Sequence, residues 1–170
     1  VRESFPDQIE ELFMVRSRKQ APVISNGDKK FREVGVFLEE NGPSVLTLDM
    51  IYGSTEGLKE TRSVLLSQTL SKKLFGEENP VGKTVKLNAD IDLLVGGVYK
   101  DLPKNSKFSE AAFFSRLLLL FRENEESMNV WNNYNIDIYV KLANNVNHVQ
   151  LAELITEKIK GHYDDWARES

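Results

Sequence analysis

The sequence predicts an α+β fold, in which helices and strands pack in layers, rather than a doubly wound sheet. Three observations support this prediction. A strand, a short helix and a hairpin follow one another between residues 63 and 103, an alternating strand occupies residues 136–142, and a helical pattern begins near residue 147. Because the elements come in groups and do not alternate regularly, layers of strands and helices suit the order better than parallel βαβ units.

The central unit begins with a strand and a capped helix. Residues 64–66 form a compact apolar run that is typical of a buried strand. Ser67 is a preferred residue for capping a helix start, and the helix after it places Leu70 and Leu74 on one face. Gly76 fits the left-handed position that ends a helix.

The unit continues through a turn at Pro80 into a predicted hairpin. Residues 84–87 and 91–99 are typical of paired strands, and the turn-forming residues 88–90 lie between them. Pro103 ends the unit because it has no N–H group to donate to a strand ladder.

Near the start, Ser4 and Pro6 predict the beginning of a helix that carries Ile9, Leu12 and Phe13 on one face. Because Pro lies in the first turn, its missing N–H group costs little there.

The next segment predicts a hairpin and a less certain element. Asn26-Gly27 is a strong hairpin signal, with residues 23–25 and 31–38 as the two strands. Residues 46–50 alternate between apolar and polar side chains and predict a strand, with an amphipathic helix as the alternative.

The C-terminal part combines apolar segments of three kinds. Residues 111–121 are dense in Phe and Leu, which fits a buried strand running into a helix, although periodicity does not decide between the two. Residues 136–142 alternate cleanly and predict a strand whose isoleucine and valine face is buried. Residues 151–166 follow helical spacing.

Composition predicts one domain, or one domain with two lobes, and excludes some functions. The 170 residues include 22 Lys and Arg against 26 Asp and Glu, and the net charge of −4 argues against nucleic acid as a partner. The absence of Cys excludes disulfides and thiolate metal sites. The longest apolar stretch, residues 117–121, is far shorter than the roughly 20 residues that span a bilayer, so the chain as given is expected to be soluble.

Gly82-Lys83-Thr84 resembles the end of a phosphate-binding loop, but its context differs. Five residues separate Gly76 from Gly82 where the motif has four, and a strand rather than a helix is predicted to follow. A turn that leads into a hairpin explains the segment better, and no cofactor is predicted.

Catalytic and metal-binding constellations are not expected either. Ser67 lacks the sequence setting of a nucleophile, and its capping role accounts for it. His148 and His162 stand in no metal-ligand spacing. The aromatic group Trp131, Tyr134 and Tyr139 is typical of a core or of an interface between lobes, with a ligand cleft as the alternative.

Residues 64–87 read VLLSQTLSKKLFGEENPVGKTVKL, and residues 93–108 read LLVGGVYKDLPKNSKF. These runs resemble the extracytoplasmic core domain of MacB/FtsX-type ABC transporter permeases, and FPDQIEELFMVRSR near the start resembles the same family more weakly. The sequence departs from the family where Ser71 replaces the usual Ala and where Leu46 and Leu48 replace an aromatic pair. The motif positions for which a structural role is expected are Ser67, Phe75, Gly76, Pro80, Gly82, Lys83, Gly97, Asp101 and Pro103.

The resemblance implies a two-lobed, MacB-like domain across residues 1–170, with mixed or antiparallel sheets and packed helices. One lobe would combine residues 1–45 with residues 108–170, and the second would comprise residues 46–107. The chain starts without Met and stops after an apparent helix, so we expect an excised fragment whose missing flanks include membrane helices.

The resemblance further implies a non-catalytic domain on the periplasmic face of the bacterial inner membrane. It would transmit ATP-driven movement to the export or release of a lipid, peptide, lipoprotein or drug, or to a partner protein. The implied partners are a cytoplasmic ABC ATPase subunit or domain and a possible periplasmic adaptor or substrate protein, and the full-length protein would be a homodimer or heterodimer. A ligand-binding sensory domain of a membrane receptor is the alternative.

Overall fold

The computed structural model describes residues 4–16, 21–121 and 136–169, and for residues 121 and 162–169 the backbone alone. The chain forms two compact units. Unit 1 is Val1–Leu12 with Val140–Ser170, and unit 2 is Phe13–Tyr139.

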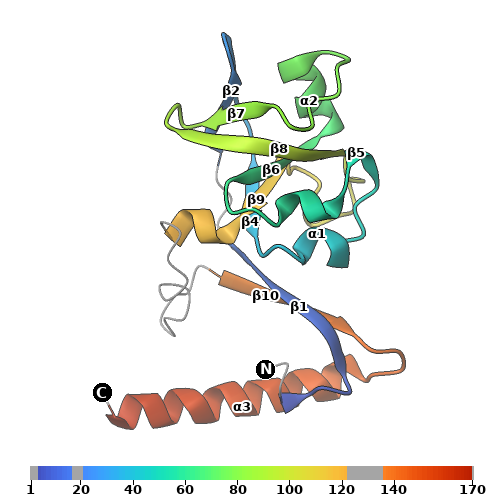
Figure 1. Cartoon of the computed structure of the whole chain (residues 1–170). Helices are drawn as coiled ribbons and strands as arrows, with labels where there is room; N and C mark the ends of the chain where they lie inside the picture. Colours follow the sequence, from blue (N-terminus) through green and yellow to red (C-terminus); the bar gives the residue numbers. More distant parts are fainter. Residues whose placement is uncertain (1–3, 17–20, 122–135, 170) are drawn as a thin grey trace. The chain divides into compact units, whose positions relative to one another are not determined.

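The elements follow the chain in Figure 1 from blue to red. The strands are β1 (Ile9–Arg16), β2 (Val23–Asn26), β3 (Lys29–Arg32), β4 (Gly35–Leu38), β5 (Met50–Gly53), β6 (Ser63–Ser67), β7 (Thr84–Leu87), β8 (Ile91–Tyr99), β9 (Phe113–Arg116) and β10 (Ile136–Leu142). The α-helices are α1 (Gly42–Val45), α2 (Gln68–Phe75) and α3 (His148–Glu169), and the 3-10 helices are η2 (Thr55–Leu58) and η3 (Leu117–Phe121).

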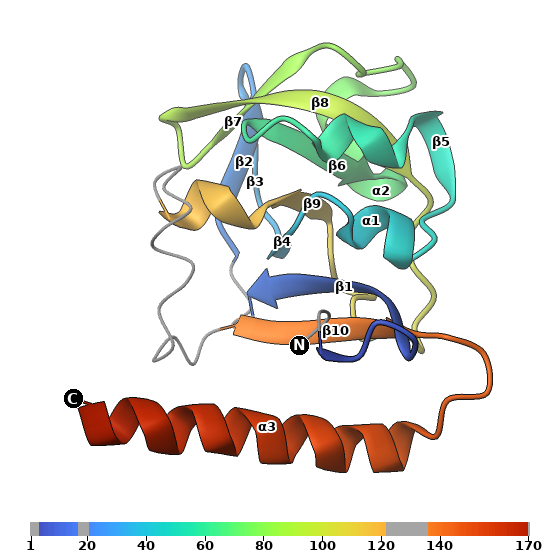
Figure 2. The same ribbon diagram turned by 60° about the horizontal axis from the view of Figure 1, so that its bottom comes forward.

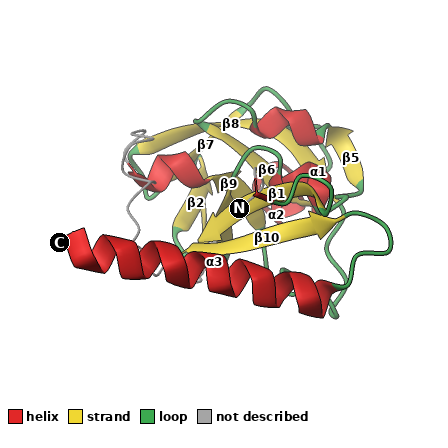
Figure 3. Cartoon of the chain, turned by 90° about the horizontal axis from the view of Figure 1, so that it is seen from below, coloured by secondary structure: helices red, strands yellow, loops and turns green. Residues whose placement is uncertain are grey.

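The strands form one mixed sheet in the order β10-β1-β4-β9-β6-β8-β7-β2-β3, with β5 paired to β8. β4 pairs with β9, and β6 with β8, in parallel, while β2–β3, β6–β9 and β7–β8 are antiparallel. Figure 3 shows these strands in yellow together with the helices in red. The mixed sheet with its helices confirms the predicted α+β class.

The central strands of unit 2 are buried on both faces, which explains their continuous apolar runs. Side chains alternate along a strand, so Val64 and Leu66 enter one core cluster while Leu65 enters another. Phe113 and Phe114 of β9 divide between the same two clusters. Helix α2 contributes to the first cluster, and the α1–η2 region contributes to the second.

The predicted central unit is confirmed element by element. The Ser67 hydroxyl accepts a hydrogen bond from the N–H group of Leu70 at 3.2 Å, and α2 ends at Gly76 with φ at +70°. β7 and β8 form the predicted hairpin, closed by the pair Leu87 and Ile91.

The helix predicted near the start is wrong, because Ile9–Arg16 is strand β1. Phe13 and Val15 are buried at alternate positions, as a strand requires. Val15 pairs with Leu38 of β4, and the Met14 carbonyl accepts a hydrogen bond from the Glu39 N–H group at 3.0 Å. This long-range pairing overrides the helical spacing of the local sequence.

The hairpin at Asn26-Gly27 is confirmed, with Gly27 at φ +58° and Asn26 paired to Lys29. The strand predicted over residues 31–38 is divided into β3 and β4, which have different partners. Residues 46–50 form neither the strand nor the alternative helix, since α1 ends at Val45, Thr47 has φ +52° and β5 begins at Met50.

The strand predicted at residues 136–142 is confirmed as β10, but its predicted buried face is wrong. Ile138 is 52% exposed and Val140 is 38% exposed. Tyr139, on the opposite face, instead stacks on Phe13 with ring centroids 5.3 Å apart. Residues 111–121 form strand β9 followed by the 3-10 helix η3, in line with a strand running into a helix.

Unit 1 contains the first half of β1, the end of β10 and α3 (Figure 2). The N–H group of Ala143 donates to the Gln8 carbonyl at 2.9 Å, and Lys141 pairs with Glu10 at 2.8 Å. Asn147 caps α3, since its side-chain oxygen accepts from the N–H group of Gln150 at 3.2 Å. No helix within the described ranges is long and apolar enough to cross a membrane.

Candidate functional site

Several of the family-motif positions lie in or beside helix α2, and two of them cap its first turn. Ser67 caps the helix from its own N-terminus, and Asp101 reaches it from the end of β8. The two carboxylate oxygens of Asp101 accept hydrogen bonds from the N–H group of Thr69 at 3.1 Å and from its hydroxyl at 2.5 Å. A negative charge here also complements the positive end of the helix dipole.

The C-terminal end of α2 is held by a second, more distant contact. The carbonyl of Leu74 accepts hydrogen bonds from the side chains of Asn26 at 3.3 Å and Lys29 at 3.2 Å. Carbonyls in the last turn of a helix have no partner within the helix, so the β2–β3 hairpin supplies one. Sequence reasoning missed this contact because nothing local connects residues 26 and 29 to residue 74.

The turn between α2 and β7 is fixed by backbone bonds rather than left open for a ligand. Pro80 is buried, and Gly82 has φ +83°. The Gly82 N–H group donates to the Val95 carbonyl at 2.9 Å, and the Val95 N–H group donates to the Lys83 carbonyl at 2.8 Å. A strand follows at Thr84, so the geometry of a phosphate-binding loop does not form.

Lys83 is also engaged by neighbouring side chains. Its ammonium group pairs with Glu78 and lies 5.6 Å from the centroid of the Phe75 ring. The hydrogen bond and the charge of Lys83 lower the pKa of Glu78. The family-motif residues Phe75 and Lys83 thus hold the turn against the helix.

Gly97 and Pro103 have structural roles as well. A Cβ atom on Gly97 would lie 2.7 Å from the end of the Met50 side chain and 3.0 Å from the Tyr52 carbonyl, so glycine permits the close packing of β5 on β8. The Pro103 carbonyl accepts from the N–H group of Ser106 at 2.9 Å and closes a turn.

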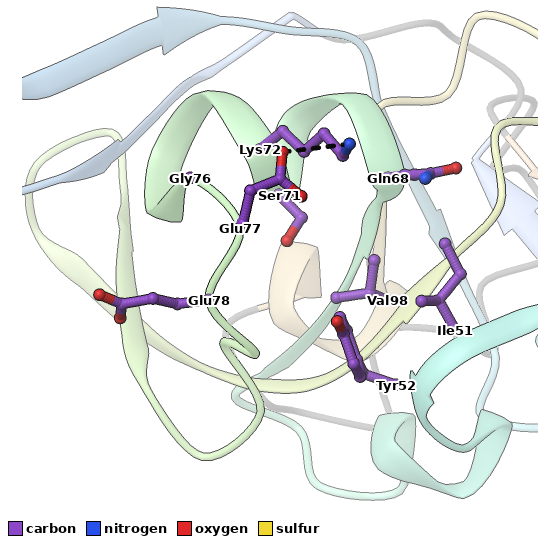
Figure 4. Close-up of a pocket in the computed structure, with 9 residues that line it drawn as sticks. All are labelled: Ile51, Tyr52, Gln68, Ser71, Lys72, Gly76, Glu77, Glu78 and Val98. Atoms are coloured by element: carbon purple, nitrogen blue, oxygen red, sulfur yellow. Dashed lines mark ion pairs between the residues drawn. The ribbon is translucent and has the colours of Figure 1, made fainter.

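A shallow pocket of about 100 Å³ lies beside α2, between the helix and the β5–β8 strands. Figure 4 shows Ile51, Tyr52 and Val98 on the strand side, and Lys72 and Glu77 joined as an ion pair on the helix side. The ion-pair distance is 3.2 Å. The pocket therefore combines apolar side chains with one charged pair.

The geometry offers little for catalysis at the residues considered. The Ser67 hydroxyl is buried and serves as the cap of α2. Across the part of the chain that the structure describes, no three His, Cys, Asp or Glu side chains form a metal-binding group. The absence of a cofactor stays a prediction.

A second pocket, of about 80 Å³, lies within unit 2 next to Tyr139. Tyr139 belongs to the aromatic group identified in the sequence, whereas Trp131 and Tyr134 lie outside the described residues. Tyr139 stacks on Phe13 and also lies against Phe108 at 5.4 Å, so it takes part in the core and lines the pocket at once. Four other lining residues lie in the segments that resemble the family, but no role in a pocket could be assigned to them from the sequence: Val15, Arg16, Lys107 and Phe108.

The family model of the MacB-like periplasmic core domain matches residues 2–158. No curated protein matches the chain.

Three solved structures share the fold. A domain described as part of a permease protein from Porphyromonas gingivalis has a TM-score of 0.75 and 23% identity, and covers 94% of this chain and 68% of its own. The periplasmic region of MacB from Actinobacillus actinomycetemcomitans has a TM-score of 0.68 and 20% identity, over 92% of this chain and 69% of its own. The extracellular domain of the ABC-type transporter YknZ from Gram-positive bacteria has a TM-score of 0.57 and 19% identity, over 82% of this chain and 68% of its own.

Proposed function

Because the chain belongs to the family of MacB-like periplasmic core domains, we propose that it is the non-catalytic extracytoplasmic part of an ABC transporter permease. A cytoplasmic ATPase subunit or domain hydrolyses ATP, and membrane helices that flank the chain carry the resulting movement outward. The domain passes this movement to the export or release of a lipid, peptide, lipoprotein or drug, or to a partner protein. It sits on the periplasmic face of the bacterial inner membrane.

The observation that carries the proposal is the role of the motif side chains. Ser67 and Asp101 cap α2, Gly82 shapes a bonded turn, and Lys83 holds that turn to Phe75. These residues stabilise the packing of the domain through contacts within the domain itself. A well-packed body with few alternative arrangements is what the transmission of a movement between distant sites requires.

The division into two lobes stays part of the proposal. One lobe comprises residues 1–45 with 108–170, and the other comprises residues 46–107. Strands β6 and β8 belong to the second lobe and stand in the middle of the strand order. Deleting residues 46–107 would therefore remove the centre of the sheet, and the test should remove the whole domain instead.

The experiment replaces residues 1–170 by a flexible Gly/Ser linker in the full-length permease. Two properties are measured: ATP hydrolysis by the purified permease with its ATPase, and rescue of a strain that lacks the permease. The proposal predicts that the linker variant still assembles and hydrolyses ATP but does not rescue the strain.

Two outcomes would count against the proposal. Rescue by the linker variant would show that the domain is not the working part. Failure of the intact protein to assemble with any ATPase would instead favour the sensory domain of a membrane receptor.

A further inference from the structure

The pocket beside Tyr139, here called the Tyr139 pocket, has the composition of a small ligand site. It is formed by β1, β4, β10 and the segment before β9, and all its lining residues belong to unit 2. Its walls are mainly apolar, with Val15, Val34, Val36 and Ala111 among them. Ligand sites are typically apolar concavities with a few polar groups that orient the ligand.

Two polar atoms of the lining residues are buried without a hydrogen-bond partner. Among the described residues, three buried side-chain nitrogen or oxygen atoms have none, and they are Arg16 Nε, Tyr139 Oη and Arg116 Nε. The first two belong to residues that line the Tyr139 pocket. Arg116 lies elsewhere, and its guanidinium donates to the Lys59 carbonyl at 2.5 Å.

Unpaired buried donors are unusual, because burial removes the water that would otherwise bond them. Arg16 Nε can only donate, and the Tyr139 hydroxyl can donate, so an acceptor atom would satisfy both. The positive guanidinium favours a carboxylate over a neutral oxygen, since charge-assisted hydrogen bonds are the stronger kind.

The other charged groups of the pocket are already engaged or exposed. The Lys107 ammonium lies 3.8 Å from the Asp137 carboxylate and 5.0 Å from the centroid of the Tyr139 ring, and its interactions with Tyr139 first and Asp137 second raise the pKa of Lys107. Because an ammonium group can only donate, the Tyr139 hydroxyl beside it keeps its own proton to donate to a ligand. Glu110 is exposed to solvent. The charge of Lys107 partly offsets that of Asp137, and solvent screens the charge of Glu110. Repulsion between these carboxylates and an anion beside Arg16 is therefore reduced.

We propose that the Tyr139 pocket binds a carboxylate attached to a short aliphatic group, with the carboxylate at Arg16 Nε and Tyr139 Oη. The volume of about 80 Å³ corresponds to roughly three water molecules, which fits a carboxylate with a small alkyl chain. The source is the carboxyl end of a peptide or a free short-chain acid. This inference goes beyond the proposed function and does not depend on it.

The test uses NMR titration of the 170-residue chain with three probes: acetyl-alanyl-valine with a free carboxyl end, its C-terminal amide, and isobutyrate. The free acid is expected to shift the backbone signals of residues 15–16, 34–36, 107–111 and 137–139. The amide should bind about tenfold more weakly, because it lacks the charge. Binding of the peptide but not of isobutyrate would assign the peptide as the source, and the reverse would assign the free acid.

Two variants separate binding from folding. Tyr139→Phe keeps the stacking on Phe13 and removes only the hydroxyl, so it should weaken binding by about three- to tenfold. Arg16→Gln should abolish the preference for the acid over the amide. Lys83→Gln is the matched control, because it removes a cation that does not line the pocket and should leave binding unchanged. Thermal unfolding of each variant shows that it is folded.

The proposal is overturned if neither acid shifts these signals at millimolar concentration. It is equally overturned if acid and amide bind alike, or if folded Arg16→Gln keeps the preference. Should Arg16→Gln fail to fold, unchanged acid binding by Tyr139→Phe would overturn it.

Discussion

The carboxylate of Asp101 accepts two hydrogen bonds from Thr69, one from the N–H group at 3.1 Å and one from the hydroxyl at 2.5 Å. These residues lie 32 positions apart in the chain. Their contact joins the segment after β8 to the first turn of α2. The helix therefore starts with two side-chain acceptors, Ser67 and Asp101, which come from the two halves of the family motif.

Asp101→Ala is expected to lower the free energy of unfolding by about 1 kcal/mol, because a helix start loses a capping acceptor. Asp90→Ala, at the exposed β7–β8 turn, is the matched control and should have little effect. Urea unfolding of the two variants measures the difference. Equal free energies of unfolding would show that the bond to Thr69 does not stabilise the fold.

Gly96→Ala is expected to cost about 3 kcal/mol or more, as overpacking against a fixed backbone does. An added Cβ atom would lie 2.1 Å from the Gly57 carbonyl oxygen, and neither backbone can move aside easily. Gly161→Ala in helix α3 is the control, since a Cβ atom there meets nothing within 4 Å. It should raise stability by about 0.5–1 kcal/mol, because alanine favours helix more than glycine does. Thermal unfolding that ranked the two variants in the opposite order would contradict this packing.

Gly82→Val should destabilise the fold by about 1–3 kcal/mol through backbone strain alone. Gly82 has φ +83°, and a Cβ atom there would meet no neighbour within 4 Å. Gly82→Asn should cost less, because asparagine tolerates positive φ better than a β-branched residue does. Chemical denaturation of both variants tests this order, and an unchanged midpoint for Gly82→Val would show that the turn imposes no such demand.

The raised pKa of Tyr99 predicts that the protein loses stability in alkaline solution. Burial, and then the charge of Asp101, raise the pKa of Tyr99 well above its usual value. The unfolded chain loses this proton at a pH of about 10 while the folded chain keeps it, so stability falls as the pH rises above that value. The contribution of protonated Tyr99 to the free energy of unfolding is fully present below pH ~10.

The comparison is with Tyr99→Phe, measured by urea unfolding from neutral to alkaline pH. At neutral pH the wild type should be more stable by about 1 kcal/mol, since the Tyr99 hydroxyl donates to the Ala111 carbonyl at 2.7 Å. That advantage should shrink above pH ~10. An advantage that stayed constant would mean that Tyr99 ionises equally well in the folded chain.

The central unit could be predicted because its signals are local. The Ser67 cap, the Gly76 stop and the β7–β8 turn each depend on residues a few positions apart. The α+β class followed from the order of such elements. The family motif pointed to the same segment, although the roles of its side chains became visible only in the structure.

The remaining features depend on long-range contacts that a local pattern does not contain. The spacing of three apolar residues near the start fits one face of a helix: Ile9, Leu12 and Phe13. The segment is nevertheless a strand, because Val15 pairs with Leu38 of β4. The alternation in β10 predicted a strand correctly, but stacking of Tyr139 on Phe13 decides which face is packed. The Tyr139 pocket draws on four separate segments, so only the tyrosine itself could be singled out beforehand.

The most direct test of the account asks whether nucleotide-driven movement reaches this domain. The chain contains no cysteine, so paired spin labels can be placed at chosen sites within it. Thr84→Cys with Glu157→Cys labels unit 2 and unit 1, and Thr84→Cys with Glu60→Cys labels unit 2 twice as the control. The labelled domain is studied in the full permease with its ATPase, after cysteines elsewhere in the protein are replaced.

Label-to-label distances are measured by pulsed electron spin resonance without nucleotide and after ATP hydrolysis in the presence of vanadate, which traps ADP on the ATPase. If ATP-driven movement reaches the domain, trapping should change the distance distribution between Thr84→Cys and Glu157→Cys, while the control pair within unit 2 keeps its distance. Vanadate trapping that leaves both distance distributions unchanged would contradict this, because the domain would then receive no movement from the ATPase.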